Sequence, residues 1–225
     1  MNSRDSILAR IRKALTVAPA QFGHQETRAS VRAGDAEFRA VLPAVGKNAD
    51  ENLALFARNA GHLHAEFNLV KGMDEAITVL KELAQVEKWD RVASHRGKLT
   101  DLACEALGLP VYSTQTEFEK ELLEKCPVGI SECDALIAQT GSVLVTSRSA
   151  GGRALSVLPP HHVVLARRDQ LIPGLPDAFA LLRARYGSAF PSMISFITGP
   201  SRTGDIERIL VLGAHGPKRL TILCL

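Results

Sequence analysis

The most constraining feature of this sequence is an alternation of short apolar runs with amphipathic helical segments, which starts near residue 50. Apolar residues at helical spacing indicate helices that begin near Asp50 and Asp74, and two more over residues 99–107 and 117–125. The short apolar runs between them, typical of strands, are residues 66–70, 91–94 and 111–113. Helices that alternate with strands are crossover connections, so the pattern predicts a mainly parallel sheet flanked by helices.

The second half of the chain is richer in strand signals. Two helices are predicted there, one over residues 176–186 that ends at Gly187, and one that opens near Asp205. The apolar runs are residues 135–138, 143–146, 163–166, 193–198 and 220–223. We therefore expect one α/β domain, with a single open sheet, over residues 48–225.

The N-terminal segment, residues 1–47, differs in pattern. Residues 3–15 form a predicted helix with one apolar face, whereas its other positions are rich in arginine and lysine. The apolar face consists of Ile7, Leu8, Ile11 and Leu15. Residues 16–47 show little periodicity and are predicted to be a flexible linker. We expect the helix to be an arm that docks on this protein or on a second subunit.

Composition excludes several classes of protein. The chain has 225 residues, is 46% hydrophobic and carries 27 Lys and Arg against 24 Asp and Glu, for a net charge of +3. The basic residues are spread along the chain without interleaved aromatics, so we expect no nucleic-acid binding. Four cysteines form no C-x-x-C pair, which argues against zinc and redox sites. No run is apolar enough to be a transmembrane segment or a signal peptide, so we predict a cytoplasmic location.

The most specific polar segment is a nine-residue run that begins at Gly199, where a predicted strand ends. A helix that opens near Asp205 would point its first N–H groups at this loop and favour an anion there. Ser201 and Thr203 would add hydroxyl donors, and Arg202 a guanidinium suited to a carboxylate or phosphate. The alternative is structural: a hydroxyl caps the helix and the arginine pairs with a nearby carboxylate.

Two further glycine-containing junctions follow apolar runs. Residues 139–142, with the sequence Gln-Thr-Gly-Ser, are predicted first as a hairpin turn and second as part of a site. Residues 213–217 contain two glycines that permit close backbone approach to a ligand, and His215, which titrates near neutral pH. A lone histidine is more often structural. No histidine pair has the helical spacing of a zinc site, and no nucleophile elbow is present, so we predict neither a metal site nor an ordinary serine hydrolase.

Four ordered segments resemble the lactate-utilisation protein C family, whose module is the LUD domain. They are residues 138–142, 158–162, 199–207 and 213–217. The resemblance is strongest from about residue 130 onward. It implies a NagB/RpiA/CoA-transferase-like α/β fold, in which anionic substrates sit at loops beyond the strand ends, as the switch-point rule for open sheets also expects.

The resemblance also implies a role, namely the oxidation of L-lactate to pyruvate beside two partner proteins, at least one of which carries iron–sulfur clusters. Because the chain has no C-x-x-C motif, it would be the component without a cluster, and we expect no cofactor on it. One departure concerns chemistry. Gln139 stands where the family commonly has Glu, so it cannot serve as the carboxylate nucleophile of related CoA transferases, although Glu132 is nearby in sequence.

The leading hypothesis is therefore a lactate-utilisation component that binds a small carboxylate or phosphate-bearing ligand. His215 is the candidate base for the hydroxyl proton of lactate. The predicted ligand-binding residues are Thr140, Gly141, Ser142, Arg153, Gly199, Ser201, Arg202, Thr203, Asp205, Gly213 and Gly216. Two alternatives stay open: a stand-alone acyl-CoA or phosphate-ester transferase, hydrolase or ligase, and a non-catalytic assembly subunit. The sequence leaves the ligand open, and also whether the chain forms a homo-oligomer.

Overall fold

The computed structural model describes residues 3–16, 42–115, 119–206 and 209–225. The chain divides into two compact units, Met1–Val41 and Leu42–Leu225. In the first unit, α1 (Ser3–Thr16) is the predicted amphipathic helix, and its apolar residues Ile7, Leu8 and Ile11 are exposed to solvent. Among the described residues, no helix combines the length and the apolar character needed to cross a membrane.

The predicted parallel sheet is confirmed. It has six strands, all parallel, because each connection between consecutive strands crosses back over the sheet. In spatial order they are β1 (Glu66–Leu69), β12 (Arg219–Cys224), β7 (His161–Ala166), β4 (Val128–Glu132), β2 (Val92–Ser94) and β3 (Val111–Ser113). The central strand β7 is buried along its whole length, as expected for a strand covered on both faces.

Helices cover one face of this sheet. α4 (Met73–Val86) and α5 (Lys98–Leu107) pack Leu80 and Ala103 against Val163 and Leu165 of β7. A short helix, α6 (Lys120–Glu124), precedes β4. It is shorter than the predicted helix over residues 117–125, part of which lies outside the described residues.

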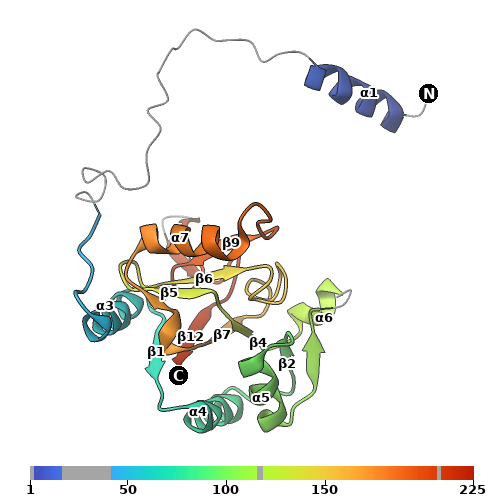
Figure 1. Cartoon of the computed structure of the whole chain (residues 1–225). Coiled ribbons are helices and arrows are strands. Elements are labelled where there is room, and N and C mark those ends of the chain that lie inside the picture. Colours follow the sequence, from blue (N-terminus) through green and yellow to red (C-terminus); the bar gives the residue numbers. More distant parts are fainter. Residues whose placement is uncertain (1–2, 17–41, 116–118, 207–208) are drawn as a thin grey trace. The chain divides into compact units, whose positions relative to one another are not determined.

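The structure adds a second sheet on the opposite face, which the sequence analysis did not separate from the first. Its strands, in spatial order, are β8 (Leu171–Ile172), β5 (Ala135–Ile137), β6 (Ser142–Thr146) and β9 (Ile194–Ile197). Alternate residues of β5 and β6 point to opposite faces, so Leu136 and Val143 pack against the parallel sheet, whereas Ile137 and Leu144 pack against α7 (Leu175–Tyr186). Figure 1 shows the two sheets between α7 on one side and α4 and α5 on the other.

Two elements connect these layers. The helix α3 (Ala49–His62), which Asn48 caps at its start, places Phe56 and Ala60 in the core between the two sheets. The 3₁₀ turn η1 (Arg168–Gln170) leads from β7 into β8.

The predicted helix near Asp205 is wrong. Residues on both sides of the undescribed positions 207–208 form an antiparallel hairpin, β10 (Arg202–Ile206) with β11 (Ile209–Leu212). The physical reason lies in the sequence, because a glycine at position 204 disfavours a helix whereas β-branched Thr203, Ile206, Ile209 and Val211 favour strands. The anion site that depended on a helix N-terminus there is therefore lost.

Candidate functional site

Two of the sequence motifs meet in space. The backbone N–H of Ser201 donates to the carbonyl of Pro217 at 2.8 Å, and that of Gly213 donates to the carbonyl of Ser201 at 2.8 Å. Gly216 lies against Ser201, since a Cβ added to Gly216 would be 3.2 Å from the Cβ of Ser201. The loop before β10 and the loop after β11 thus form one structural unit.

This unit borders a pocket of about 450 Å³. One side of the pocket consists of Val157, Leu158 and Pro160, which precede β7. The remaining lining residues are Lys120 and Glu124 of α6 together with Gly213, Ala214, His215, Gly216 and Lys218. The pocket lies at the amino ends of β7 and β12, because Pro160 and Lys218 each directly precede one of these strands. The predicted loops are therefore not at the carboxyl ends of the parallel strands.

Lys218 is held in place at the edge of this pocket. Its backbone N–H donates to the carbonyl of Pro160 at 2.7 Å. Gly213 has a φ of 74°, and a Cβ at this glycine would lie only 2.1 Å from the Cγ of Lys218. A side chain at position 213 would therefore be strained and would displace the lysine stem from this loop.

The segment 139–142 forms the predicted hairpin turn, between β5 and β6, where Ile137 pairs with Ser142. Gly141 packs onto α3. The Oγ of Ser142 lies 2.8 Å from the Oγ1 of Thr198, and the buried Oγ1 of Thr140 has no hydrogen-bond partner within the described part of the chain. None of these side chains lines the pocket.

Gln139 is engaged entirely with backbone groups. Its Nε2 donates to the carbonyl of Pro43 at 2.5 Å, and its Oε1 accepts the backbone N–H of Leu175, the first residue of α7, at 3.2 Å. Its own backbone N–H donates to the carbonyl of Pro173. An amide fits this position because one neighbour accepts and the other donates, which accounts for a glutamine here in place of a glutamate.

The other predicted ligand residues lie apart from the pocket. Gly199 packs against the end of α3, where a Cβ would be 2.6 Å from the carbonyl oxygen of Leu63 and 3.5 Å from the Nη2 of Arg202. Arg202 therefore lies beside the carboxyl end of a helix, which favours a cation. Thr203 pairs with Val211 in the hairpin.

Two predicted residues remain. The side chain of Asp205 lies outside the described residues. Arg153 is exposed and lies two residues after Gly151, which packs against His95 and Thr114 at the carboxyl ends of β2 and β3.

A second polar cluster, which the sequence analysis missed, lies at the switch point of the parallel sheet. β2 and β4 are neighbours in the sheet. After β2 the chain continues to β3 on one side of this pair, and after β4 it continues to β7 on the other side. A crevice is therefore expected at the carboxyl ends of β2 and β4. There the Oε1 of Glu132 accepts the backbone N–H groups of Leu99 and Thr100, in the first turn of α5, at 2.8 and 3.4 Å. The carboxylate thus occupies the positive end of this helix.

His95 completes this cluster. The backbone N–H of Glu132 donates to the Nε2 of His95 at 3.1 Å, so this nitrogen is unprotonated, and the Nδ1 donates to the carbonyl of Arg96 at 3.0 Å. Burial lowers the pKa of His95, which agrees with a neutral ring. Sequence reasoning missed the cluster because it did not identify β4, and because the meeting of β2 with β4 depends on strand order.

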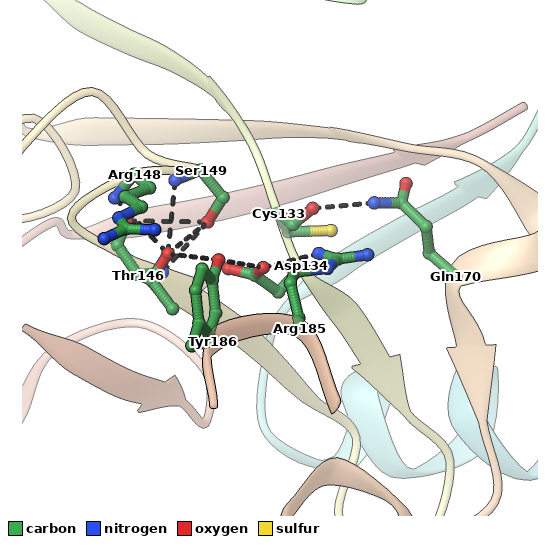
Figure 2. A network of polar contacts seen from close by, with 8 residues as sticks. All are labelled: Cys133, Asp134, Thr146, Arg148, Ser149, Gln170, Arg185 and Tyr186. Carbon is green, nitrogen blue, oxygen red and sulfur yellow. Dashed lines mark hydrogen bonds and ion pairs between the residues drawn. The ribbon is translucent and has the colours of Figure 1, made fainter. Parts of the chain in front are cut away.

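The residues after Glu132 connect this cluster to α7 (Figure 2). The carbonyl of Cys133 accepts a hydrogen bond from the Nε2 of Gln170 at 2.6 Å. The Oδ1 of Asp134, a residue that is 1% exposed, accepts from the Nη1 of Arg185 at 2.5 Å and from the hydroxyl of Tyr186 at 2.6 Å. We call residues 132–134 the connector, because they join β4 of the parallel sheet to β5 of the second sheet.

Comparisons with known proteins agree with this fold. The family model of the LUD domain matches residues 53–225. A lactate utilization protein C of Oceanobacillus iheyensis is 24% identical over 189 residues, which span 79% of this chain and 81% of the relative. The protein of the same name from Geobacillus kaustophilus is 38% identical over 98 residues, 43% of this chain and 41% of the relative. The one from Bacillus subtilis is 33% identical over 115 residues, 49% of this chain and 48% of the relative.

A solved structure resembles the fold. The crystal structure of a DUF162 family protein from Deinococcus radiodurans superposes with a TM-score of 0.59 and 19% sequence identity, over 80% of this chain and 99% of that chain. At this identity the likeness bears on the fold alone.

Proposed function

Because the chain belongs to the LUD domain family, with a role in lactate utilisation, we propose that it is a cytoplasmic component of a system that oxidises L-lactate to pyruvate. Its partners in this proposal are iron–sulfur proteins that carry the electrons, since this chain has no C-x-x-C motif of its own. The single observation that carries the proposal is the match of the LUD domain model to residues 53–225, together with relatives named lactate utilization protein C.

We further propose that the pocket beside Ser201 and residues 213–216 binds the anionic ligand of this chain. The support is its lining, which includes His215 and Lys218 on a loop held by backbone hydrogen bonds. His215 is exposed at the pocket, where its imidazole can accept a proton from a hydroxyl of the ligand.

A second candidate is a non-catalytic assembly role, and one observation favours it. The helix α1 exposes Ile7 and Ile11 about half to solvent, at 53% and 49%, along one face. An apolar helix face of this kind suits docking in a groove of another protein. This role predicts that α1 is needed for partner binding and that the pocket is dispensable.

Growth on L-lactate tests the proposed role. A strain that lacks the gene, and has no other lactate dehydrogenase, should fail on L-lactate as sole carbon source and grow on glucose. The wild-type gene should restore growth, and His215→Ala should not. Lys71→Met, which alters an exposed lysine outside the pocket, is the matched control. Normal growth of the deletion strain on L-lactate would remove the role. Rescue by His215→Ala but not by a variant without residues 1–16 would favour assembly.

A further inference from the structure

We propose, on the basis of the function proposed above, that the pocket at the amino ends of β7 and β12 takes an organic phosphate larger than L-lactate. Lys218 and His215 bind the phosphate, and a less polar body of the ligand lies on Val157, Leu158 and Pro160. This inference names the class of ligand. It differs from L-lactate, the compound that the family role alone suggests.

Size is the first argument. The pocket volume of about 450 Å³ falls within the range of roughly 300–1,000 Å³ that holds drug-sized ligands. L-lactate is a small hydroxy acid that would fill only a minor part of this space. The pocket therefore has room for a ligand with a larger body than that of lactate.

Charge is the second argument. Of the ionisable groups in the lining, Lys120 and Glu124 pair with each other at 3.3 Å. Lys218 and His215 have no ion-pair partner among the residues that the structure describes. Lys218 and His215 thus provide an ammonium and an imidazole that line the same pocket, and such groups suit a phosphate, which carries up to two negative charges and several acceptor oxygens.

The pocket is also divided by polarity. Val157, Leu158 and Pro160 come from the segment that leads into β7, whereas the cationic side chains come from the loop before β12 and from α6. Two backbone hydrogen bonds, from Lys218 and Arg219 to the carbonyl of Pro160, hold these two segments together. A ligand with a charged end and an apolar end matches this arrangement better than a compact, fully polar acid.

Isothermal titration calorimetry on the full chain tests the proposal. The probes are ADP, coenzyme A and flavin mononucleotide, which share a phosphate and differ in their bodies, beside inorganic phosphate and L-lactate. At least one organic phosphate should bind more tightly than inorganic phosphate and L-lactate. Lys218→Met should weaken that binding by roughly ten- to a hundredfold, the effect of losing one charged hydrogen bond. Val157→Asp should also weaken it, because the new carboxylate would lose water of hydration against the apolar body of the ligand.

Lys71→Met is the control and should leave binding unchanged, since this exposed lysine is outside the pocket. No saturable binding of any of the three organic phosphates would overturn the inference, as would binding that Lys218→Met and Val157→Asp do not affect. The inference would also be overturned if L-lactate bound as tightly as the organic phosphates and if its binding depended on Lys218 to the same extent. These failures are distinct from failure of the proposed role, which growth on L-lactate reports.

Discussion

Gly141 shows how closely a single residue in the β5–β6 turn is matched to its surroundings. Its φ is 65°, and an added Cβ would lie 2.6 Å from the backbone nitrogen of Ala60 in α3. We expect Gly141→Ala to lower the free energy of unfolding by about 2–4 kcal/mol, because both backbone strain and a clash with a helix backbone oppose it. Urea denaturation measures this. The control is Gly61→Ala in α3, where an added Cβ would have no other atom within 4 Å. This substitution should be neutral or should stabilise the protein by up to about 1 kcal/mol.

Gln139 yields a prediction with a pH signature. Gln139→Glu would place a carboxylate oxygen against the carbonyl of Pro43, where the amide now donates at 2.5 Å. We expect a loss of about 1–3 kcal/mol in the free energy of unfolding near pH 7. A protonated carboxyl can donate again, so the loss should shrink as the pH falls toward about 4. Urea denaturation at both pH values checks this, and a loss independent of pH would contradict the hydrogen-bond assignment.

At the residue scale, local motifs predicted part of the candidate site. The glycine-rich segments around Ser201 and His215 were identified from sequence, and they do lie together. Lys120 and Lys218 were not, because a surface lysine carries no local pattern that marks it as pocket-lining. Glu132 was noticed only as a nearby carboxylate, since its contact with α5 joins residues that are 33 positions apart.

At the scale of elements, the connector fixes the carboxyl end of α7 to the junction of the two sheets (Figure 2). The Oδ2 of Asp134 has no partner within the described residues, so the two donors to Oδ1 are the contacts that stabilise this buried carboxylate. Tyr186→Phe removes one of them and should lower the free energy of unfolding by about 1–2 kcal/mol, measured in urea.

The control for this prediction is on the same helix. Arg183 is exposed, and Arg183→Ala should change stability by less than about 0.5 kcal/mol. Equal stabilities of the two variants would show that the hydroxyl of Tyr186 does not stabilise the connector.

Elements whose apolar residues recur at a regular spacing were predictable from the sequence, and elements that depend on pairing between distant segments were not. The strand at residues 111–113 and the helix at 176–186 follow from local patterns. β4 escaped prediction because Gly129 and Ser131 interrupt its apolar pattern, although the strand is central and almost fully buried. Whether the apolar runs of the second half form one sheet or two depends on which face each strand covers, and this is decided by packing against α7 and β7.

At the scale of the whole molecule, buried histidines make stability depend on pH. His162 is fully buried, with Nε2 2.8 Å from the Oγ of Ser131, and burial lowers its pKa from 6.5 to about 3. Between these values the unfolded chain binds a proton that the folded chain does not, so the free energy of unfolding should fall as the pH falls below 6.5. The contribution of one histidine is at most about 1.4 kcal/mol per pH unit.

Urea denaturation between about pH 7 and pH 4.5 measures this slope. The double variant Ser131→Ala/His162→Leu removes both the histidine and its hydroxyl partner, so no buried polar group is left alone. Its stability should fall less steeply with pH than that of the wild type. Identical slopes would mean that other groups account for the acid sensitivity.

The last prediction concerns the division of the chain into two units. Every buried residue of the four apolar clusters lies between residues 42 and 225, and the first unit contributes none of those described. A chain that begins at residue 42 keeps Pro43, which accepts a hydrogen bond from Gln139, and should therefore unfold cooperatively with a Tm within about 2 °C of the full chain.

Differential scanning calorimetry measures this, and a chain that begins at residue 48 is the comparison. The second chain loses the carbonyl of Pro43 and also Gly46, whose backbone makes two hydrogen bonds with the buried side chain of Asn52, so it should be less stable by about 1–3 kcal/mol. If the chain from residue 42 is already as unstable as the chain from residue 48, the stable core depends on residues 1–41 as well. If both match the full chain, the Gln139 hydrogen bond to Pro43 does not stabilise the fold.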